Sequence, residues 1–153
     1  MNKRRVVITG LGIVSPVGNN VNDAWANIIN GVSGIAPITN IDTEIQAVKF
    51  GGAVKEFDVS QYLSPKEAKK MDIFIHYGMA AGIQAFEDSG IEVTDENAER
   101  IGVAIGAGIG GLTTIEKTAD LFREKGPKRI SPFFVPSSII NMVSGNMSIK
   151  FGL

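Results

Sequence analysis

The 153-residue sequence contains no cysteine and only one histidine, which excludes several classes of protein. Without cysteine the chain forms no disulfide, offers no thiolate nucleophile and binds no zinc through sulfur. A Ser-His-Asp triad would have to use His76, which stands inside the apolar stretch 71–86. A lone histidine in such a stretch is typical of a packing residue. We therefore expect neither a catalytic residue nor a metal ligand in this chain.

The sequence also lacks an excess of charge and long apolar runs. Fifteen Lys and Arg stand against 16 Asp and Glu, so no overall basic field favours nucleic acid. No stretch approaches the roughly 18 apolar residues of a membrane span. Residues 1–14 resemble a signal peptide, but their apolar run is short and contains Thr9, Gly10 and Gly12. We expect one cytoplasmic domain over 1–153, without cofactor, nucleic acid or membrane partner.

Predicted strands alternate with predicted helices along the chain. The β-branched segments 4–10 and 101–105 are predicted strands, and 47–57 is expected to be extended with a bend at Gly51 and Gly52. One helix is expected to begin at the cap Asn20 or Asn22 and to end at Gly31, and a second to begin with Ser64 as its cap and Pro65 as its first residue. Three further helices are expected over 72–88, 112–126 and 137–149. This order favours an α/β protein with a largely parallel or mixed sheet. The helices 72–88 and 137–149 are apolar almost all round, so the chain is expected either to expose a large apolar surface or to close a compact core of its own.

Residues 106–111 place Gly106, Gly108 and Gly111 in the spacing G-x-G-x-x-G. A dinucleotide-binding fold also needs a following strand that ends in an acidic residue about 20 residues on. Here the next helix leads only to a loop and another helix, and no GK[ST] follows the glycines. We interpret the glycines as positions of close approach by backbone or an extended ligand, with positive φ in the turn.

Three stretches, in order and with matching spacing, resemble one family: RRVVITGLGIVSPVGNN (4–20), IGVAIGAGIGGL (101–112) and ISPFFVPSSIINMVSGNMSIKFGL (130–153). They resemble the amino-terminal part of the β-ketoacyl-[acyl carrier protein] synthases, in particular the synthase II branch that elongates bacterial fatty acids. The resemblance runs over 3–153. It implies the amino-terminal part of a thiolase-like fold, a mixed sheet with helices on both faces, in a protein that acts as a homodimer.

The family's reaction is a decarboxylative Claisen condensation between an acyl-enzyme thioester and malonyl on acyl carrier protein. In the family the nucleophilic cysteine, two histidines and a lysine follow the segment that matches 130–153. None of them is present here, so the resemblance implies an incomplete chain, truncated before the nucleophile and catalytically silent alone. The alternative is a non-catalytic ketosynthase-like module that pairs with a full subunit or binds acyl carrier protein.

The resemblance also implies binding residues. Ile109 matches a bulky gate of the acyl pocket, and Phe134 matches a residue that lines that pocket across the dimer interface; ordinary packing is the alternative for both. Acyl carrier protein is acidic, and the family meets it with a basic surface. The matching residues here are Lys66, Lys69, Lys70, Lys128 and Arg129. The first three have helical spacing and can share a face, although a merely solvated helix and turn would look the same.

Overall fold

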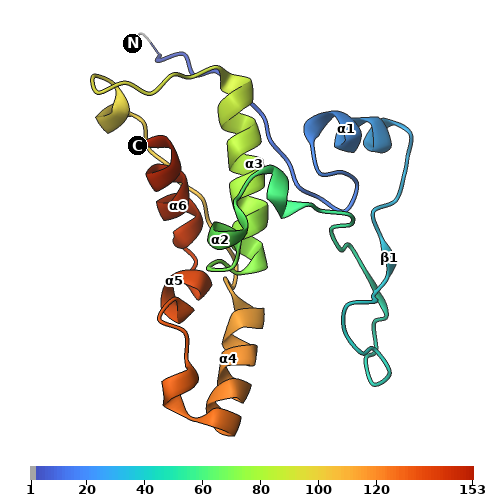
Figure 1. Cartoon of the computed structure of the whole chain (residues 1–153). Helices are drawn as coiled ribbons and strands as arrows, with labels where there is room; N and C mark the ends of the chain where they lie inside the picture. Colours follow the sequence, from blue (N-terminus) through green and yellow to red (C-terminus); the bar gives the residue numbers. More distant parts are fainter. Residues whose placement is uncertain (1–2) are drawn as a thin grey trace.

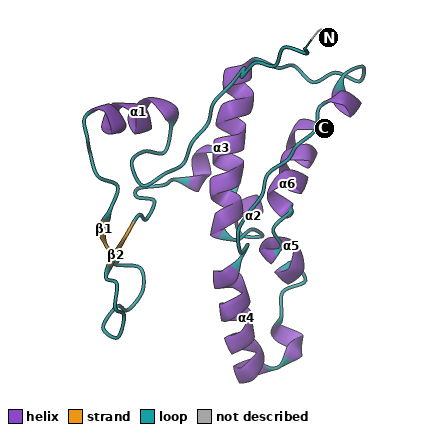
Figure 2. Ribbon diagram, turned by 180° about the vertical axis from the view of Figure 1, so that it is seen from behind, coloured by secondary structure: helices purple, strands orange, loops and turns teal. Residues whose placement is uncertain are grey.

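The computed structural model describes residues 3–153, and it is built mainly of helices around the long α3 (Ile73–Ser89). Figure 1 shows α6 (Met142–Phe151) beside α3 and α4 (Leu112–Lys125) below it, with α1 (Val21–Ile29) to one side. Figure 2 shows the same arrangement from behind. The other helices are short: η1 (Val59–Gln61), α2 (Pro65–Ala68), η2 (Ala98–Arg100), η3 (Pro127–Arg129) and α5 (Phe134–Ser138). Within 3–153, no helix combines the length and the apolar character needed to cross a membrane.

Local sequence signals set the helix ends where we predicted them. The Asn20 side chain caps α1. The Ser64 hydroxyl accepts the Glu67 N–H and so caps α2. The Glu67 carboxylate in turn accepts the Ser64 N–H, which completes a capping box. Gly126, with a φ of 75°, ends α4 directly before a proline. These boundaries follow from neighbours within a few residues, which explains why the sequence predicts them well.

The single helix expected over 137–149 is wrong, because α5 ends at Ser138 and α6 begins only at Met142. The Ser137 carbonyl accepts a hydrogen bond from the Asp72 N–H at 3.3 Å, and the Ser138 carbonyl accepts one from the Gly111 N–H at 2.8 Å. Since these two carbonyls bond to other parts of the chain instead of to the next helical turn, the helix breaks here.

The strands predicted over 4–10 and 101–105 are not formed, because neither segment joins a ladder with another described segment. The expectation of a largely parallel or mixed sheet with helices on both faces is wrong for residues 3–153. Their sheet is one short antiparallel pair, β1 (Ala36–Pro37) with β2 (Phe50–Gly51). Exposure still alternates along 101–105, where Val103 packs against the core. A strand needs a neighbour to pair its N–H and C=O groups, so these two segments have strand character without a strand partner.

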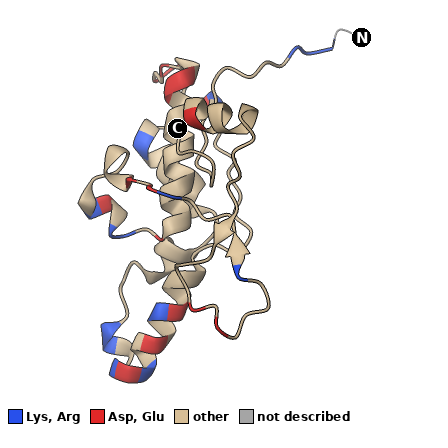
Figure 3. Cartoon of the chain, turned by 90° about the vertical axis from the view of Figure 1, so that its right-hand side faces the viewer, with Lys and Arg blue, Asp and Glu red and all other residues tan. Residues whose placement is uncertain are grey.

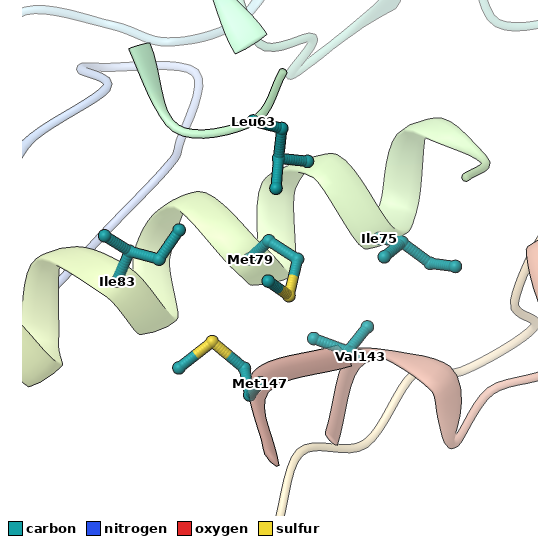
Figure 4. Packing of buried hydrophobic residues seen from close by; sticks show 6 residues of the cluster. All are labelled: Leu63, Ile75, Met79, Ile83, Val143 and Met147. Atoms are coloured by element: carbon teal, nitrogen blue, oxygen red, sulfur yellow. The ribbon is translucent and has the colours of Figure 1, made fainter. Parts of the chain in front are cut away.

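The buried core lies between α3 and α6 and is shown in Figure 4. Two glycines of α3 let the helices approach closely, because Gly78 faces Val143 and Gly82 faces Met147. The core side chains are each at most 4% exposed and are Leu63, Ile75, Met79, Ile83, Val143 and Met147. The prediction that α3 is buried is thus confirmed for one of its faces.

Large apolar surfaces remain open elsewhere, which is the first of the two alternatives that the sequence left open. Val6 and Ile8 in the first extended segment are 83% and 82% exposed. In α1, Trp25 is 62% exposed and only Ala24 is buried. The described residues therefore do not close a compact core around every apolar face.

Candidate functional site

The glycine loop (residues 106–111) is open through most of its length and fixed directly before it begins. The backbone N–H of Ile105 donates to the Ser144 hydroxyl at 3.0 Å, and the same hydroxyl donates to the Ile105 carbonyl at 3.2 Å. A β-carbon on Gly106 or Gly108 would have no neighbouring atom within 4 Å. The start of the loop is thus tied to α6, whereas the following residues have room to move.

The carboxyl-terminal end of the loop is packed tightly against α5. The Gly111 N–H donates to the Ser138 carbonyl at 2.8 Å. Gly110 has a φ of 80°, and a β-carbon there would lie 2.5 Å from the same carbonyl oxygen. The positive φ falls on Gly110, beside the motif glycines, and a β-carbon on Gly111 would lie 2.8 Å from Ser138 Cα. Our interpretation is therefore confirmed for this end of the loop, whereas Gly106 and Gly108 have neither a positive φ nor a close neighbour among the described residues.

One carboxylate caps two helices at this point. Asp72 is 6% exposed; its Oδ1 accepts the Phe74 N–H of α3 at 3.3 Å. Its Oδ2 accepts the backbone N–H and the hydroxyl of Thr114 in α4, at 3.0 and 2.6 Å. The N-cap position of α4 is Gly111, which has no side chain to accept a hydrogen bond. Asp72 therefore supplies to α4 the cap that α4 lacks.

The same arrangement argues against nucleotide binding. In the dinucleotide fold a phosphate occupies the helix N-terminus that follows the glycines. At the N-terminus of α4 that place is already taken by the carboxylate of Asp72. A phosphate would meet a like charge there.

In the sequence, Asp72 is only the first residue of a predicted helix. The bond from Asp72 to Thr114 joins residues 42 positions apart, so no local pattern reveals it. The one available signal was indirect: α4 begins directly after Gly111, with no Ser, Thr, Asp or Asn to cap it.

The two residues expected to line an acyl pocket lie on connected parts of the structure. Ile109 is in the open part of the glycine loop and is 69% exposed. Phe134 is half-buried and is the first residue of α5. Since α5 ends at Ser138, which binds Gly111, a single turn of helix links Phe134 to the loop of Ile109.

The basic residues expected to dock a carrier protein are all exposed, but their helix is shorter than expected. Lys66 lies in α2, Lys69 is its C-cap and Lys70 follows it. Lys128 and Arg129 lie in η3. In Figure 3 the lower end of the molecule, where α4 and η3 lie, shows acidic and basic residues side by side.

A contact joins these two basic segments. The Lys70 ammonium lies 4.6 Å from the centroid of the Phe133 ring, a cation–π contact between the turn after α2 and the segment after η3. Lys70 and Phe133 also border a hollow of about 360 Å³ between α2, α5 and α6, which is lined mainly by apolar side chains such as Met71 and Met142. Lys150 adds a second ammonium at this hollow.

Two titratable residues near α2 have identifiable roles. The hydroxyl and then the N–H of Ser64 donate to the Glu67 carboxylate and hold its pKa below the ordinary value.

His76 Nε2 lies 2.9 Å from the carbonyl oxygen of Ala68, so the imidazole joins α3 to the end of α2. His76 is thus a packing residue, as predicted.

Comparison with known proteins gives the family. The family model "Beta-ketoacyl synthase, N-terminal domain" matches residues 3–153. The chain is 59% identical over 153 residues to 3-oxoacyl-[acyl-carrier-protein] synthase 2 of Vibrio cholerae and 50% identical over 153 residues to that of Coxiella burnetii. In both cases 100% of this chain and 37% of the relative are covered. The chain therefore spans just over a third of the length of these curated relatives.

Solved structures show the same fold. The ishigamide ketosynthase/chain length factor has a TM-score of 0.78 at 25% identity, with 97% of this chain and 37% of that chain covered. A β-ketoacyl synthase from Burkholderia phymatum has a TM-score of 0.78 at 20% identity, with coverage of 99% and 38%. The predicted fold class, the incomplete amino-terminal part of a thiolase-like α/β fold, is thereby confirmed. The chain belongs to the β-ketoacyl synthase family, and it corresponds to the amino-terminal domain of that family.

Proposed function

We propose that the complete protein containing this chain is a condensing enzyme of fatty acid elongation, a 3-oxoacyl-[acyl-carrier-protein] synthase. The observation that carries this proposal is the 59% identity to such a synthase over all 153 residues. The match of the family model over 3–153 supports it. The glycine loop and the exposed basic residues of this chain fit the same reaction.

The proposed reaction has two steps. An enzyme thiolate first takes the acyl group from a carrier thioester and releases the carrier thiol. The malonyl thioester then loses CO₂, and its α-carbon attacks the acyl-enzyme carbonyl, which forms the β-ketoacyl thioester and returns the enzyme thiolate. This chain has no cysteine, so residues outside it must supply the nucleophile. We expect the 153 residues alone to be catalytically silent.

The first contribution of this chain is to select the acyl group. We propose that Ile109 gates the acyl pocket and that Phe134 lines it across a dimer interface. A gate must move at little steric cost, and Gly106 and Gly108 have open space around them. Ile109 follows these two glycines directly and is 69% exposed, so its side chain can swing with the loop.

The second contribution is to bind acyl carrier protein. We propose that the basic surface, defined as Lys66, Lys69, Lys70, Lys128 and Arg129, attracts this acidic partner. All five side chains are exposed, and the contact of Lys70 with Phe133 connects the two segments that carry them. Such surface charges act mainly on the encounter rate and the orientation of the partner. We further propose that the complete protein is cytoplasmic and acts as a homodimer.

The test is a condensation assay with purified acyl and malonyl carrier protein. The complete protein should form one β-ketoacyl carrier protein for each CO₂ released. The isolated 153-residue chain should form none and should capture no thiol-directed inhibitor. If the complete protein binds carrier protein but releases no CO₂ and forms no product, the protein is a non-catalytic module and the proposal is wrong.

A further inference from the structure

Among residues 3–153, no cationic side chain forms an ion pair with the buried carboxylate of Asp72. The ion pair formed within residues 3–153 joins Arg123 to Asp120, far along α4 from this carboxylate. A buried charge is costly unless hydrogen bonds compensate it. Around Asp72 three donors do so: the Phe74 N–H and the N–H and hydroxyl of Thr114. The three hydrogen bonds that stabilise the carboxylate therefore form only when the N-termini of α3 and α4 lie beside it at the same time.

This carboxylate belongs to a joint that also includes α5. The backbone N–H of Asp72 donates to the Ser137 carbonyl at 3.3 Å, next to the Ser138 carbonyl that accepts from Gly111. Thr114 lies only three residues after Gly111. Asp72 therefore holds α3, α4 and α5 together at the carboxyl-terminal end of the glycine loop.

The other end of the loop is fixed separately, by Ser144 of α6 on Ile105. Between the two attachments lies the open stretch 106–109, which carries Ile109 at its end. A short stretch fixed at both ends can move only as its attachments allow. The Asp72 joint thus fixes one of the two ends between which Ile109 lies.

We infer that Asp72 is a positioning residue for the glycine loop: by capping α3 and α4 together, it fixes the end from which Ile109 is presented. Asp72 touches no reacting atom, and it acts on the glycine loop through Thr114 and Gly111. The expected effect on acyl selection rests on the proposed function, whereas the effect on the loop itself does not.

The variants are made in the complete protein. Asp72→Asn keeps the size of the side chain, but its amide nitrogen cannot accept a hydrogen bond, so one of the two caps is lost. Thr114→Val removes the hydroxyl donor to Asp72, and Thr114→Ser retains it. Asn20→Ala removes the cap of α1, a helix on another part of the structure, and serves as the matched control for general loss of stability.

Amide hydrogen exchange reports on the loop directly. In Asp72→Asn the one remaining oxygen can cap only one of the two helices, so the amides of 73–75 or those of 111–115 should exchange about fivefold faster or more, the change that loss of a typical cap produces. Thr114→Val should act in the same direction, and Thr114→Ser should behave as the wild type. The control Asn20→Ala should leave 111–115 unchanged. If Asp72→Asn leaves the amides of both 73–75 and 111–115 at the wild-type exchange rate, or if Thr114→Val leaves those of 111–115 there, the inference is wrong, whatever the activity.

Acyl selection gives the second readout. The ratio of kcat/KM for long and short acyl substrates should shift by about threefold or more in Asp72→Asn, since small displacements of positioning groups have large kinetic effects. Combined with Ile109→Ala, the Asp72 substitution should shift the ratio no further, because the side chain being positioned is gone. If Asp72→Asn shifts the ratio of kcat/KM values by the same factor when Ile109 is already replaced by alanine, the inference is wrong. Absence of condensation in the wild-type complete protein contradicts the proposed function instead, and hydrogen exchange then still decides the role of Asp72.

Discussion

Gly78 of α3 lies against Val143 of α6 so closely that a β-carbon on the glycine would stand 2.5 Å from Val143 Cγ1. The contact belongs to the buried core of the chain, in which Val143 is 2% exposed. One turn later, a β-carbon on Gly82 would meet the sulfur and methyl carbon of Met147 at 2.8 Å. The two contacts differ in kind, because a valine side chain on a helix is stiff and the end of a methionine is flexible.

Gly78→Ala should destabilise the protein. The new methyl group overpacks a stiff contact at a cost of about 1–3 kcal/mol, which outweighs the gain of about 1 kcal/mol that alanine brings to a helix. Urea unfolding of the complete protein should show a lower midpoint with an unchanged slope.

Two other glycine variants serve as controls for Gly78→Ala. Gly82→Ala should cost less, because the end of Met147 can shift. Gly145→Ala should stabilise the protein, since the new β-carbon would lie 3.7 Å from Met142, an ordinary contact. Equal effects of Gly78→Ala and Gly145→Ala would show that the close approach of α3 and α6 is not what limits position 78.

The first glycine-rich stretch lies against the other side of α3, and Gly12 is its tightest point. A β-carbon there would be 2.0 Å from the Ala81 carbonyl oxygen and 2.7 Å from the Ala85 nitrogen, both backbone atoms that cannot turn aside. Gly12→Ala should therefore lower the free energy of unfolding by at least about 2 kcal/mol. A loss below about 0.5 kcal/mol, the usual range for a surface substitution, would refute this close approach.

The parts of the fold that the sequence predicts are those decided by near neighbours. Asn20 and Ser64 cap the helices that directly follow them, and Gly126 ends the helix that directly precedes it. The break between α5 and α6 could not be predicted, because it depends on donors from Asp72 and Gly111, which are distant in sequence. The strand 101–105 has the right pattern, but a ladder also requires a partner.

In the candidate site, too, some residues can be found from the sequence and others depend on contacts between distant segments. Ile109 and the exposed lysines are candidates only through the family resemblance, which assigns expected roles to their positions in the chain. It could not find the second cap made by Asp72, since the hydrogen bond to Thr114 exists only once α3 and α4 have come together. Local patterns thus identify exposed candidate residues such as Ile109 more readily than the buried Asp72, whose second capped helix is distant in sequence.

Acidification should loosen α2 through its capping box. Hydrogen bonds from Ser64 lower the pKa of Glu67 in the folded state, with smaller contributions from Lys150 and Lys70. A lowered folded pKa means that the stabilisation is present above the unfolded pKa and is lost as the pH falls through the folded pKa. An NMR titration of the Glu67 carboxyl should show this lowered value. Ser64→Ala should raise the pKa towards its ordinary value more than Lys150→Gln does; the reverse order would contradict the assigned cause.

Charge reversal on the basic surface should weaken the use of carrier-bound substrate. In the complete protein, Lys69→Glu combined with Arg129→Glu should lower kcat/KM for acyl carrier protein by about tenfold or more at low salt, and the effect should shrink as salt is added. A short pantetheine thioester carries no acidic protein and should be used almost as well as before. Equal loss on both substrates would mean that these residues support the fold and not the docking.

The central claim is that residues of this chain select the acyl group of a condensing enzyme, and the chain-length profile of Ile109→Phe tests it most directly. The larger ring narrows the entrance that Ile109 is proposed to gate. In the complete protein, kcat/KM for long acyl substrates should fall by about tenfold or more, while the shortest substrates are condensed at nearly the wild-type rate. A profile that is unchanged, or that falls equally at every chain length, would contradict the claim.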